Sequence, residues 1–105
     1  MVKRFDIYLV NLNPIVGSEI KKTRPCIIVS PDEMNILKTV IITPLTSKGF
    51  DFIFRPKIKF QNKNGLILLD QIRAIDKSRL VKKIGSVREK KAKIISNVLV
   101  EMFKF

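Results

Sequence analysis

The segment KKTRPCIIVS, residues Lys21 to Ser30, joins a run of positive charge directly to a run of apolar, mostly β-branched residues. Its second half, Cys26 to Val29, is typical of a short buried β-strand. Its first half is polar and predicts an exposed loop. Pro25 has no backbone N–H and therefore suits the first position of the strand. Arg24 stands at the junction, so it is either a solvated loop end or a cation that a rigid strand holds in place.

Similar short apolar segments lie on both sides of this strand, and turn signals separate them. Asn13-Pro14 and the stretch 16–18 indicate a loop after the first strand, and residues 46–49 form a second polar loop. Ser30-Pro31 resembles a helix start, with room only for a short turn. Residues 62–65 read as a tight turn, and residues 76–80 as one short helical turn. The expected strands are residues 6–11, 26–29, 39–45, 52–54, 57–60, 66–69 and 81–87, with a further apolar stretch at 71–75.

The C-terminal segment differs from the rest, because its apolar residues recur at helical spacing. Ser86 and Glu89 match a capping box, which predicts that a helix starts there. The helix is amphipathic, with lysines on its solvent side. We expect its apolar stripe to serve the core or a subunit contact rather than a membrane anchor. The stripe consists of Ala92, Ile95, Leu99 and Met102, widened by Ile94, Val98 and Phe105.

Many short strands with turns between them predict a mainly β fold: a small, strongly curved sheet or partly closed barrel of six or seven strands, with short helical turns and one C-terminal helix. A chain of 105 residues fits one domain, so we expect residues 1–105 to form a single unit. A core of this size leaves a thin margin of stability, which makes self-association unsurprising.

The net charge is the strongest feature of the composition. Twenty-one Lys and Arg residues face nine Asp and Glu, which gives +12 at neutral pH and a pI near 10.2. Such an excess attracts polyanions, nucleic acid first among them. The positive charge gathers between residues 52 and 69 and again between residues 82 and 93.

Other features of the composition concern location. No apolar run has the length of a membrane span, and the first residues make a poor signal peptide. The single cysteine, Cys26, excludes an internal disulfide and a zinc site of several cysteines. We expect Cys26 to be a small buried side chain rather than a nucleophile. The cytoplasm is the simplest location.

The absence of histidine from the sequence narrows the chemistry. It rules out Ser-His-Asp and Cys-His catalysis. No phosphate-binding glycine loop is present, and the acidic residues are scattered, so we expect no cofactor and no metal, although a Mg²⁺ site built from distant carboxylates stays open. Arginine, lysine and hydroxyl groups remain, and these stabilise charge on a phosphate. RNA carries its own nucleophile, the 2′-OH, so the composition is compatible with RNA cleavage.

Four ordered blocks of the sequence carry a resemblance to a known family. They are DIYLVNLNP with VGSE (residues 6–14 and 16–19), TRP with Ile28-Val29 (23–25 and 28–29), LTS (45–47) and LDQIRAIDKSRL (69–80). Together they are similar to the MazF/PemK (Kid-like) toxins of bacterial toxin–antitoxin pairs. One departure is Phe5-Asp6, where the family commonly has Gly-Asp; a glycine there often supports an unusual backbone angle.

The resemblance implies an SH3-like barrel, a homodimer, and a sequence-specific endoribonuclease that acts on single-stranded RNA. It implies cleavage without a metal, which leaves a 2′,3′-cyclic phosphate and a 5′-hydroxyl. It also implies an acidic, partly disordered antitoxin as partner, to which the positive charge of this chain is suited.

The family's catalytic arginine falls on Arg24 and its catalytic threonine on Thr46, although Thr46 can equally be a turn-capping hydroxyl. Glu19 is the best-placed candidate base, unless it is only solvated. Gln71 and Arg73 either contact RNA or bond strands to loops. Tyr8 and several phenylalanines (50, 52, 54 and 60) either stack on bases or, for the most part, fill the core. The expected RNA-binding residues are Ser18, Lys21, Lys22, Ser47, Lys48, Gln71 and Arg73.

Two other functions fit the same fold class. One is a gyrase poison like CcdB, which acts by protein contact and does not need the pair of Arg24 and Thr46. CcdB-type proteins depend on their C-terminal residues, and the ending Phe103-Lys104-Phe105 does not resemble theirs. The other is an RNA-binding barrel without catalysis.

Overall fold

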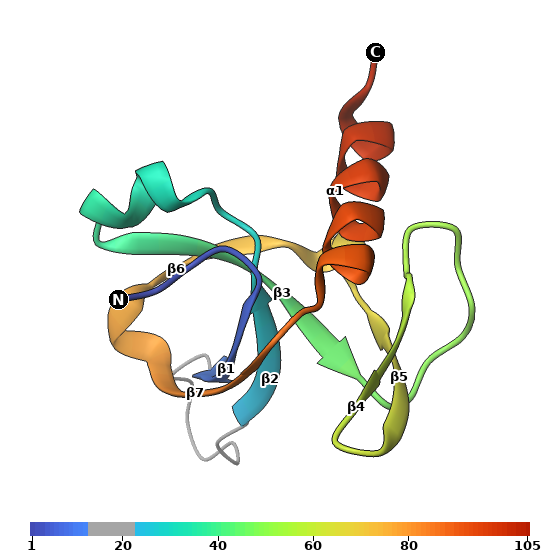
Figure 1. Ribbon diagram of the computed structural model, residues 1–105, viewed down its shortest axis with the longest axis horizontal. Coiled ribbons are helices and arrows are strands. Elements are labelled where there is room, and N and C mark those ends of the chain that lie inside the picture. Colours follow the sequence, from blue (N-terminus) through green and yellow to red (C-terminus); the bar gives the residue numbers. More distant parts are fainter. Residues whose placement is uncertain (13–22) are drawn as a thin grey trace, which may run out of the picture.

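Seven strands form one curled antiparallel sheet in the computed structural model, which describes residues 1–12 and 23–105 (Figure 1). The hydrogen-bonded order is β4-β5-β3-β2-β1-β7, and β6 pairs with β3 beside this path. One long helix, α1 (Glu89–Phe103), follows the last strand. The mainly β, partly closed barrel with a C-terminal helix is therefore confirmed. The strands are β1 (Asp6–Asn11), β2 (Thr23–Ile28), β3 (Thr39–Thr46), β4 (Lys57–Phe60), β5 (Lys63–Ile67), β6 (Arg73–Asp76) and β7 (Leu80–Ser86).

Strand β3 connects the two parts of the barrel. Its first half, from Thr39 to Ile42, pairs with β6, whereas Leu45 and Thr46 at its end pair with β5. Its other edge pairs with β2. Register shifts within the β1–β7 pairing bend the sheet further, as bulges do. The end of β3 therefore lies where the β4–β5 hairpin meets the rest of the sheet (Figure 1).

The sheet buries apolar side chains on both faces. Ile27 and Ile28 are neighbours on β2 that belong to different clusters, because successive strand residues point to opposite faces. Ile27 belongs to the cluster beneath α1, which we call the helix-side core; Ile28 belongs to the far-side core. The helix-side core comprises Ile7, Ile27, Leu45, Ile67, Leu69 and Ile95, and the far-side core Val10, Cys26, Ile28, Val40, Ile42 and Ile75.

Helix α1 packs on the helix-side core through the predicted stripe. Ala92 and Ile95 are buried, and Val98, Leu99 and Met102 pack against the core more loosely. The expectation was wrong for Ile94 and Phe105, which are exposed to solvent. Within the described residues, no helix has the length and apolar character needed to span a membrane.

Several predicted boundaries were wrong where tertiary pairing decides them. Strand β2 begins at Thr23, so Pro25 is its third residue. Residues 52–54 form no strand; there a turn closes with the N–H of Arg55 bonded to the carbonyl of Phe52. Residues 63–65, expected in a turn, belong to β5, and the turn lies at residues 61 and 62, which both have positive φ.

The two predicted serine caps were also wrong. Ser30 instead accepts the N–H of Ile41 with its hydroxyl, at 3.1 Å, and the short 3-10 turn Asp32–Ile36 follows Pro31 without a side-chain cap. Ser86 is the last residue of β7, and α1 begins only after Arg88. The other two 3-10 turns are Leu69–Gln71 and Lys77–Arg79, the second of which was predicted.

Candidate active site

The pairing of β2 and β3 decides where Arg24 and Thr46 lie. Ile28 is opposite Ile42, and Cys26 is opposite Pro44. Strand side chains two residues apart share a face. Arg24 and Thr46 stand two residues beyond the Cys26–Pro44 pair on their respective strands, so the register brings both to one face at the same end of the sheet.

Both side chains line one hollow, which we call the Arg24–Thr46 cleft. Its volume is about 400 Å³. The start of β2 and the end of β3 form one wall, and the β4–β5 hairpin forms the other. Three cations and no acid line it among the described residues. The lining is Arg24, Pro25, Leu45, Thr46, Ser47, Lys48, Ile58, Phe60, Gln61, Lys63, Asn64 and Gly65.

Arg24 is held by a strand and is not a loop end. It is the second residue of β2, where it pairs with Val10 of β1, and its side chain is half-buried. The buried residues Cys26 to Ile28 that follow anchor the strand in the core. In residues 1–12 and 23–105, no carboxylate forms an ion pair with Arg24. Its charge therefore faces the cleft without neutralisation from that part of the chain.

Thr46 ends β3 and begins the following turn. Its Oγ1 accepts the backbone N–H of Lys48 at 3.1 Å. This is the turn-capping bond that we expected from the sequence as the alternative role of Thr46. This bond uses a lone pair of the oxygen, so the hydroxyl hydrogen is still able to donate. A phosphate oxygen in the cleft is a suitable acceptor for that hydrogen.

The structure brings together some of the predicted site residues and separates others. Ser47 and Lys48 are exposed and line the cleft beside Arg24 and Thr46. The exposed Gln71 and Arg73 do not line it; Gln71 ends a 3-10 turn, and Arg73 begins β6 opposite Ile42. The predictions for Ser18, Glu19, Lys21 and Lys22 fall on residues outside the described part of the chain.

No signal in the sequence places the hairpin residues Gln61, Lys63, Asn64 and Gly65 in the site. A polar turn signal and a basic cluster were visible there, but the pairing of β5 with the end of β3 was not. Only that pairing carries these residues to the cleft.

Cys26 lies on the same strand as Arg24 and is fully buried, as predicted. Burial raises the pKa of its thiol to about 12, against the smaller opposite effects of the charges on Arg24 and Arg73. At neutral pH it is a neutral thiol, which excludes it as a thiolate nucleophile. Arg73 lies across β3 from this strand, because it pairs with Ile42, which pairs in turn with Ile28 of β2.

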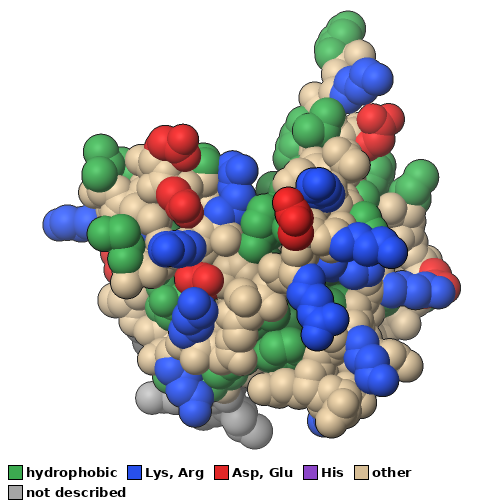
Figure 2. All heavy atoms as spheres, in the orientation of Figure 1, with side chains coloured by type: hydrophobic (Ala, Val, Ile, Leu, Met, Phe, Trp, Pro, Cys, Tyr) green, Lys and Arg blue, Asp and Glu red, His purple; other side chains and the backbone are tan. Residues whose placement is uncertain are grey.

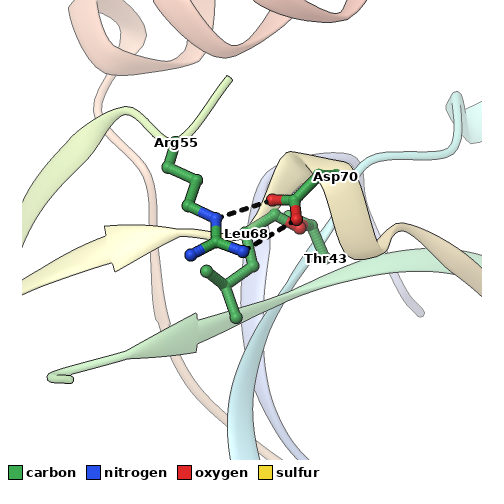
Figure 3. A network of polar contacts seen from close by, with 4 residues as sticks. All are labelled: Thr43, Arg55, Leu68 and Asp70. Carbon is green, nitrogen blue, oxygen red and sulfur yellow. Dashed lines mark hydrogen bonds and ion pairs between the residues drawn. The ribbon is translucent and has the colours of Figure 1, made fainter. Parts of the chain in front are cut away.

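An ion pair anchors the loop that leaves the site after Thr46 (Figure 3). Arg55 binds Asp70 with two bonds of 2.9 Å, from Nε to Oδ1 and from Nη2 to Oδ2. The bond with Arg55 lowers the pKa of the Asp70 carboxyl. The Arg55 guanidinium also lies 5.0 Å from the Phe50 ring centre and 5.8 Å from that of Phe52. Two residues before Asp70, the carbonyl of Leu68 accepts the Thr43 hydroxyl at 2.8 Å, which ties this turn to β3.

The aromatic residues are divided between core and surface. Phe60 packs on the helix-side core and Tyr8 on the far-side core. Phe50 and Phe52 are instead exposed on the loop that Arg55 anchors, so the expectation that most phenylalanines serve the core was wrong for these two. Within residues 1–12 and 23–105, no group of three potential metal-ligating side chains gathers.

The fold and the cleft define a class of protein: a small curled β-barrel that presents arginine, lysine and hydroxyl groups at one end of its sheet. A family model described as PemK-like, MazF-like toxin of type II toxin–antitoxin systems matches residues 3–103. The chain belongs to this family, and the predicted resemblance is confirmed.

Curated relatives match almost the whole chain. Endoribonuclease MazF of Staphylococcus saprophyticus is 36% identical over 106 residues, which cover 94% of this chain and 88% of that protein. Endoribonuclease MazF of Staphylococcus epidermidis is 34% identical with the same coverage.

Solved structures share the fold. A MazE–MazF complex from Deinococcus radiodurans has a TM-score of 0.83 at 19% identity and covers 96% of this chain and 94% of that one. An endoribonuclease from a mycobacterial species, solved with its cognate antitoxin, has a TM-score of 0.79 at 20% identity, with coverage of 96% and 93%.

Proposed function

We propose that this chain is the toxin of a type II toxin–antitoxin pair and a sequence-specific endoribonuclease that cleaves single-stranded RNA without a metal. Membership of the family supports the role of toxin. Two relatives named endoribonuclease, 34% and 36% identical over most of the chain, support the activity. The single observation that carries the proposal is that Arg24 and Thr46, which correspond to the family's catalytic pair, line one basic cleft.

The chemistry follows from what these groups do at a phosphodiester. The RNA 2′-oxygen attacks the adjacent phosphorus, the bond from phosphorus to the 5′-oxygen breaks, and a 2′,3′-cyclic phosphate and a 5′-hydroxyl result. The Arg24 fork binds two phosphate oxygens and stabilises the charge that grows on them. The Thr46 hydroxyl donates to a phosphate oxygen and fixes its position. The 2′-OH proton passes to a base, for which Glu19 is our candidate, and the 5′-oxygen takes up a proton from solvent water as it leaves.

Ser47 and Lys48 extend the contact with the backbone on either side of the scissile phosphate. Ser18, Lys21, Lys22, Gln71 and Arg73 are further proposed RNA contacts. No step needs a cofactor or a metal ion, because the nucleophile belongs to the substrate.

The proposed partners follow from the family. The neighbours solved with MazE or another antitoxin support an antitoxin as partner of this chain, and its net charge of +12 favours an acidic one. We also propose that the chain works as a homodimer in the cytoplasm and that residues 1–105 act as one toxin domain.

The test is incubation of the purified protein with RNA in excess EDTA, followed by analysis of the fragment ends. We expect cleavage with cyclic-phosphate and 5′-hydroxyl ends. Arg24→Ala should lower the cleavage rate by about 10²–10³ while the fold is retained. Arg4→Ala, which removes an exposed arginine outside the cleft, is the matched control and should cleave normally. Intact RNA with stalled gyrase, or RNA binding without cleavage, would contradict the proposal.

A further inference from the structure

A second hollow continues from the Arg24–Thr46 cleft. The two share Ser47, Lys48, Ile58, Asn64 and Gly65, so they adjoin along the loop after β3 and the β4–β5 hairpin. The second has a volume of about 700 Å³ and runs between the loop after β3, strand β4 and the first turn of α1. We call it the lysine hollow, because Lys48, Lys57, Lys59 and Lys91 line it with one acid, Asp51.

These lysines come from separate parts of the chain. Lys57 and Lys59 are two residues apart on β4 and therefore point to the same side of the hairpin. Lys91 reaches them from α1, and its Nζ donates to the carbonyl oxygen of Lys57 at 2.6 Å. Figure 2 shows the basic side chains gathered over the β4–β5 hairpin and the base of α1.

The positive charge of the lysine hollow is poorly neutralised. Asp51 approaches Lys57 only to 3.7 Å, and both side chains are 77% exposed, so water screens this pair. The acceptor of Lys91 is a neutral carbonyl, which leaves its charge intact. No described acid forms an ion pair with Lys59. A set of four lysines close together, with a single acid that water screens, is a surface for a polyanion.

We propose that the lysine hollow binds the sugar–phosphate backbone of the same RNA strand whose scissile phosphate lies in the Arg24–Thr46 cleft. This inference rests on the proposed function. The two hollows adjoin and both are basic, which favours one long polyanion that passes from one to the other over two separate ligands. Lysines act as point charges on phosphates, so the hollow adds affinity for RNA of any sequence and leaves the choice of cleavage site to the cleft.

The proposal predicts a definite salt dependence. Each phosphate that a single strand presents to a lysine releases bound counterions, and the slope of log affinity against log salt changes by about 0.7 per contact. Removal of three contacts should therefore reduce the slope by about 2. The test variant is K57Q/K59Q/K91Q, in which the glutamine at position 91 is still able to donate a hydrogen bond. The control K38Q/K82Q/K104Q removes the same charge from exposed lysines that do not line either hollow.

The experiment measures binding of each full-length protein to a random-sequence 2′-O-methyl RNA pool over a range of salt concentrations. This probe has no 2′-OH to attack phosphorus, so cleavage does not interfere. We expect K57Q/K59Q/K91Q to lose about 2 from the slope and the control to lose less than half as much. In parallel, lengthening an unmodified RNA should raise kcat/KM for the wild type and for the control, but not for K57Q/K59Q/K91Q.

The outcomes separate this inference from the proposed function. Equal slopes for the two triple variants would overturn the inference while cleavage by the wild type stands. If K57Q/K59Q/K91Q loses the expected slope of log affinity against log salt, but the wild type does not cleave RNA, the proposed function alone is overturned. A variant K57Q/K59Q/K91Q that keeps its RNA slope but no longer binds an acidic antitoxin peptide would assign the hollow to the antitoxin and overturn the inference.

Discussion

Gly65 of β5 lies so close to Thr46 of β3 that a Cβ atom at position 65 would stand 2.6 Å from the Thr46 carbonyl oxygen. Real Cβ atoms do not approach a backbone oxygen so closely. Gly65 does not have a positive φ, so the requirement for glycine comes from space alone. The hairpin is thus pressed against the residue that we assign to the scissile phosphate, and glycine makes this contact possible.

Gly65→Ala should therefore move Thr46 or the hairpin and reduce cleavage. Displacement of a catalytic group by about 1 Å costs about 10²-fold in rate. We therefore expect the cleavage rate to fall by about tenfold to a hundredfold. Overpacking should also lower the melting temperature. Single-turnover RNA cleavage and thermal melting measure the two effects.

Gly85→Ala is the matched control. A Cβ there meets the ring of Phe60 at 3.2 Å, and a ring edge yields more easily than a backbone carbonyl. Phe60 lines the cleft but is not one of the groups assigned to the phosphate, so this variant should lose some stability and less activity than Gly65→Ala. Equal losses of cleavage in both variants, at a temperature where both are folded, would show that Gly65 has no special relation to Thr46.

Thr46→Val and Thr46→Ser separate the two roles of the hydroxyl. Valine removes both the acceptor for the Lys48 N–H and the proposed donor to phosphate. We expect about 1 kcal/mol of lost stability and a rate lower by about 10²–10³. Serine keeps both groups and should retain most of the activity. If Thr46→Val cleaves RNA as well as the wild type, the hydroxyl caps the turn and does nothing more.

The sequence predicted the elements whose signal is local. Strands β1 and β3 and the buried face of α1 follow from runs of apolar residues at period 2 or 3.6. The predicted serine caps were wrong because each serine has another structural role. The hydroxyl of Ser30 accepts the N–H of Ile41, and Ser86 is the last residue of strand β7. Local patterns do not reveal such tertiary competitors.

The same limit applies to the site. Arg24 and Thr46 were predicted through the family resemblance, because nothing local shows that strands β2 and β3 pair in the register that brings them together. Lys63 to Gly65 read as a turn because they are polar, yet they form a strand that pairs with β4 and reaches Thr46. Lys91 is on the polar side of its helix by sequence, and only packing shows that it bonds to β4.

The ion pair between Arg55 and Asp70 should make stability depend on pH at the acidic end. Arg55 lowers the pKa of Asp70 in the folded state below its value of about 3.9 in the unfolded chain. The pair therefore stabilises the fold fully above that unfolded value, and the effect disappears as the pH falls through the lowered folded value. The melting temperature of Asp70→Asn should lie below that of the wild type at neutral pH, and the gap should close below a pH of about 4.

Asp51→Asn is the control for this prediction. Asp51 meets Lys57 at 3.7 Å with both side chains largely exposed, so its loss should change the melting temperature little at any pH. A gap for Asp70→Asn that persists unchanged in acid would mean that the ion pair is not its cause.

Cys26 should give a pH dependence at the alkaline end. Its folded pKa of about 12 lies above the value of about 8.5 for a free thiol, so the unfolded chain ionises first as the pH rises. Stability from the buried neutral thiol is complete below about 8.5 and declines by about 1.4 kcal/mol per pH unit between the two values. Cys26→Ala removes this decline. Melting curves of both proteins from neutral pH to pH about 11 should converge or cross; parallel curves would contradict the assigned pKa.

Phe5 has a left-handed backbone conformation, which glycine adopts more readily than any other residue. Its φ is +70°, in the left-handed region that costs a non-glycine residue about 1–2 kcal/mol. The conformation is imposed from both sides, since the Phe5 N–H donates to the carbonyl of Ile28 at 2.7 Å and its carbonyl accepts the N–H of Val87 at 2.8 Å. The ring repays part of this cost by packing on the helix-side core.

Two substitutions at position 5 separate strain from packing. Phe5→Ala loses the ring and keeps the strained backbone, whereas Phe5→Gly loses the ring and relieves the strain. We therefore expect Phe5→Gly to be more stable than Phe5→Ala by about 1 kcal/mol, although glycine normally destabilises a folded chain relative to alanine. Urea denaturation of the two variants measures the difference directly. If Phe5→Ala is the more stable of the two, the left-handed backbone at this residue carries no strain.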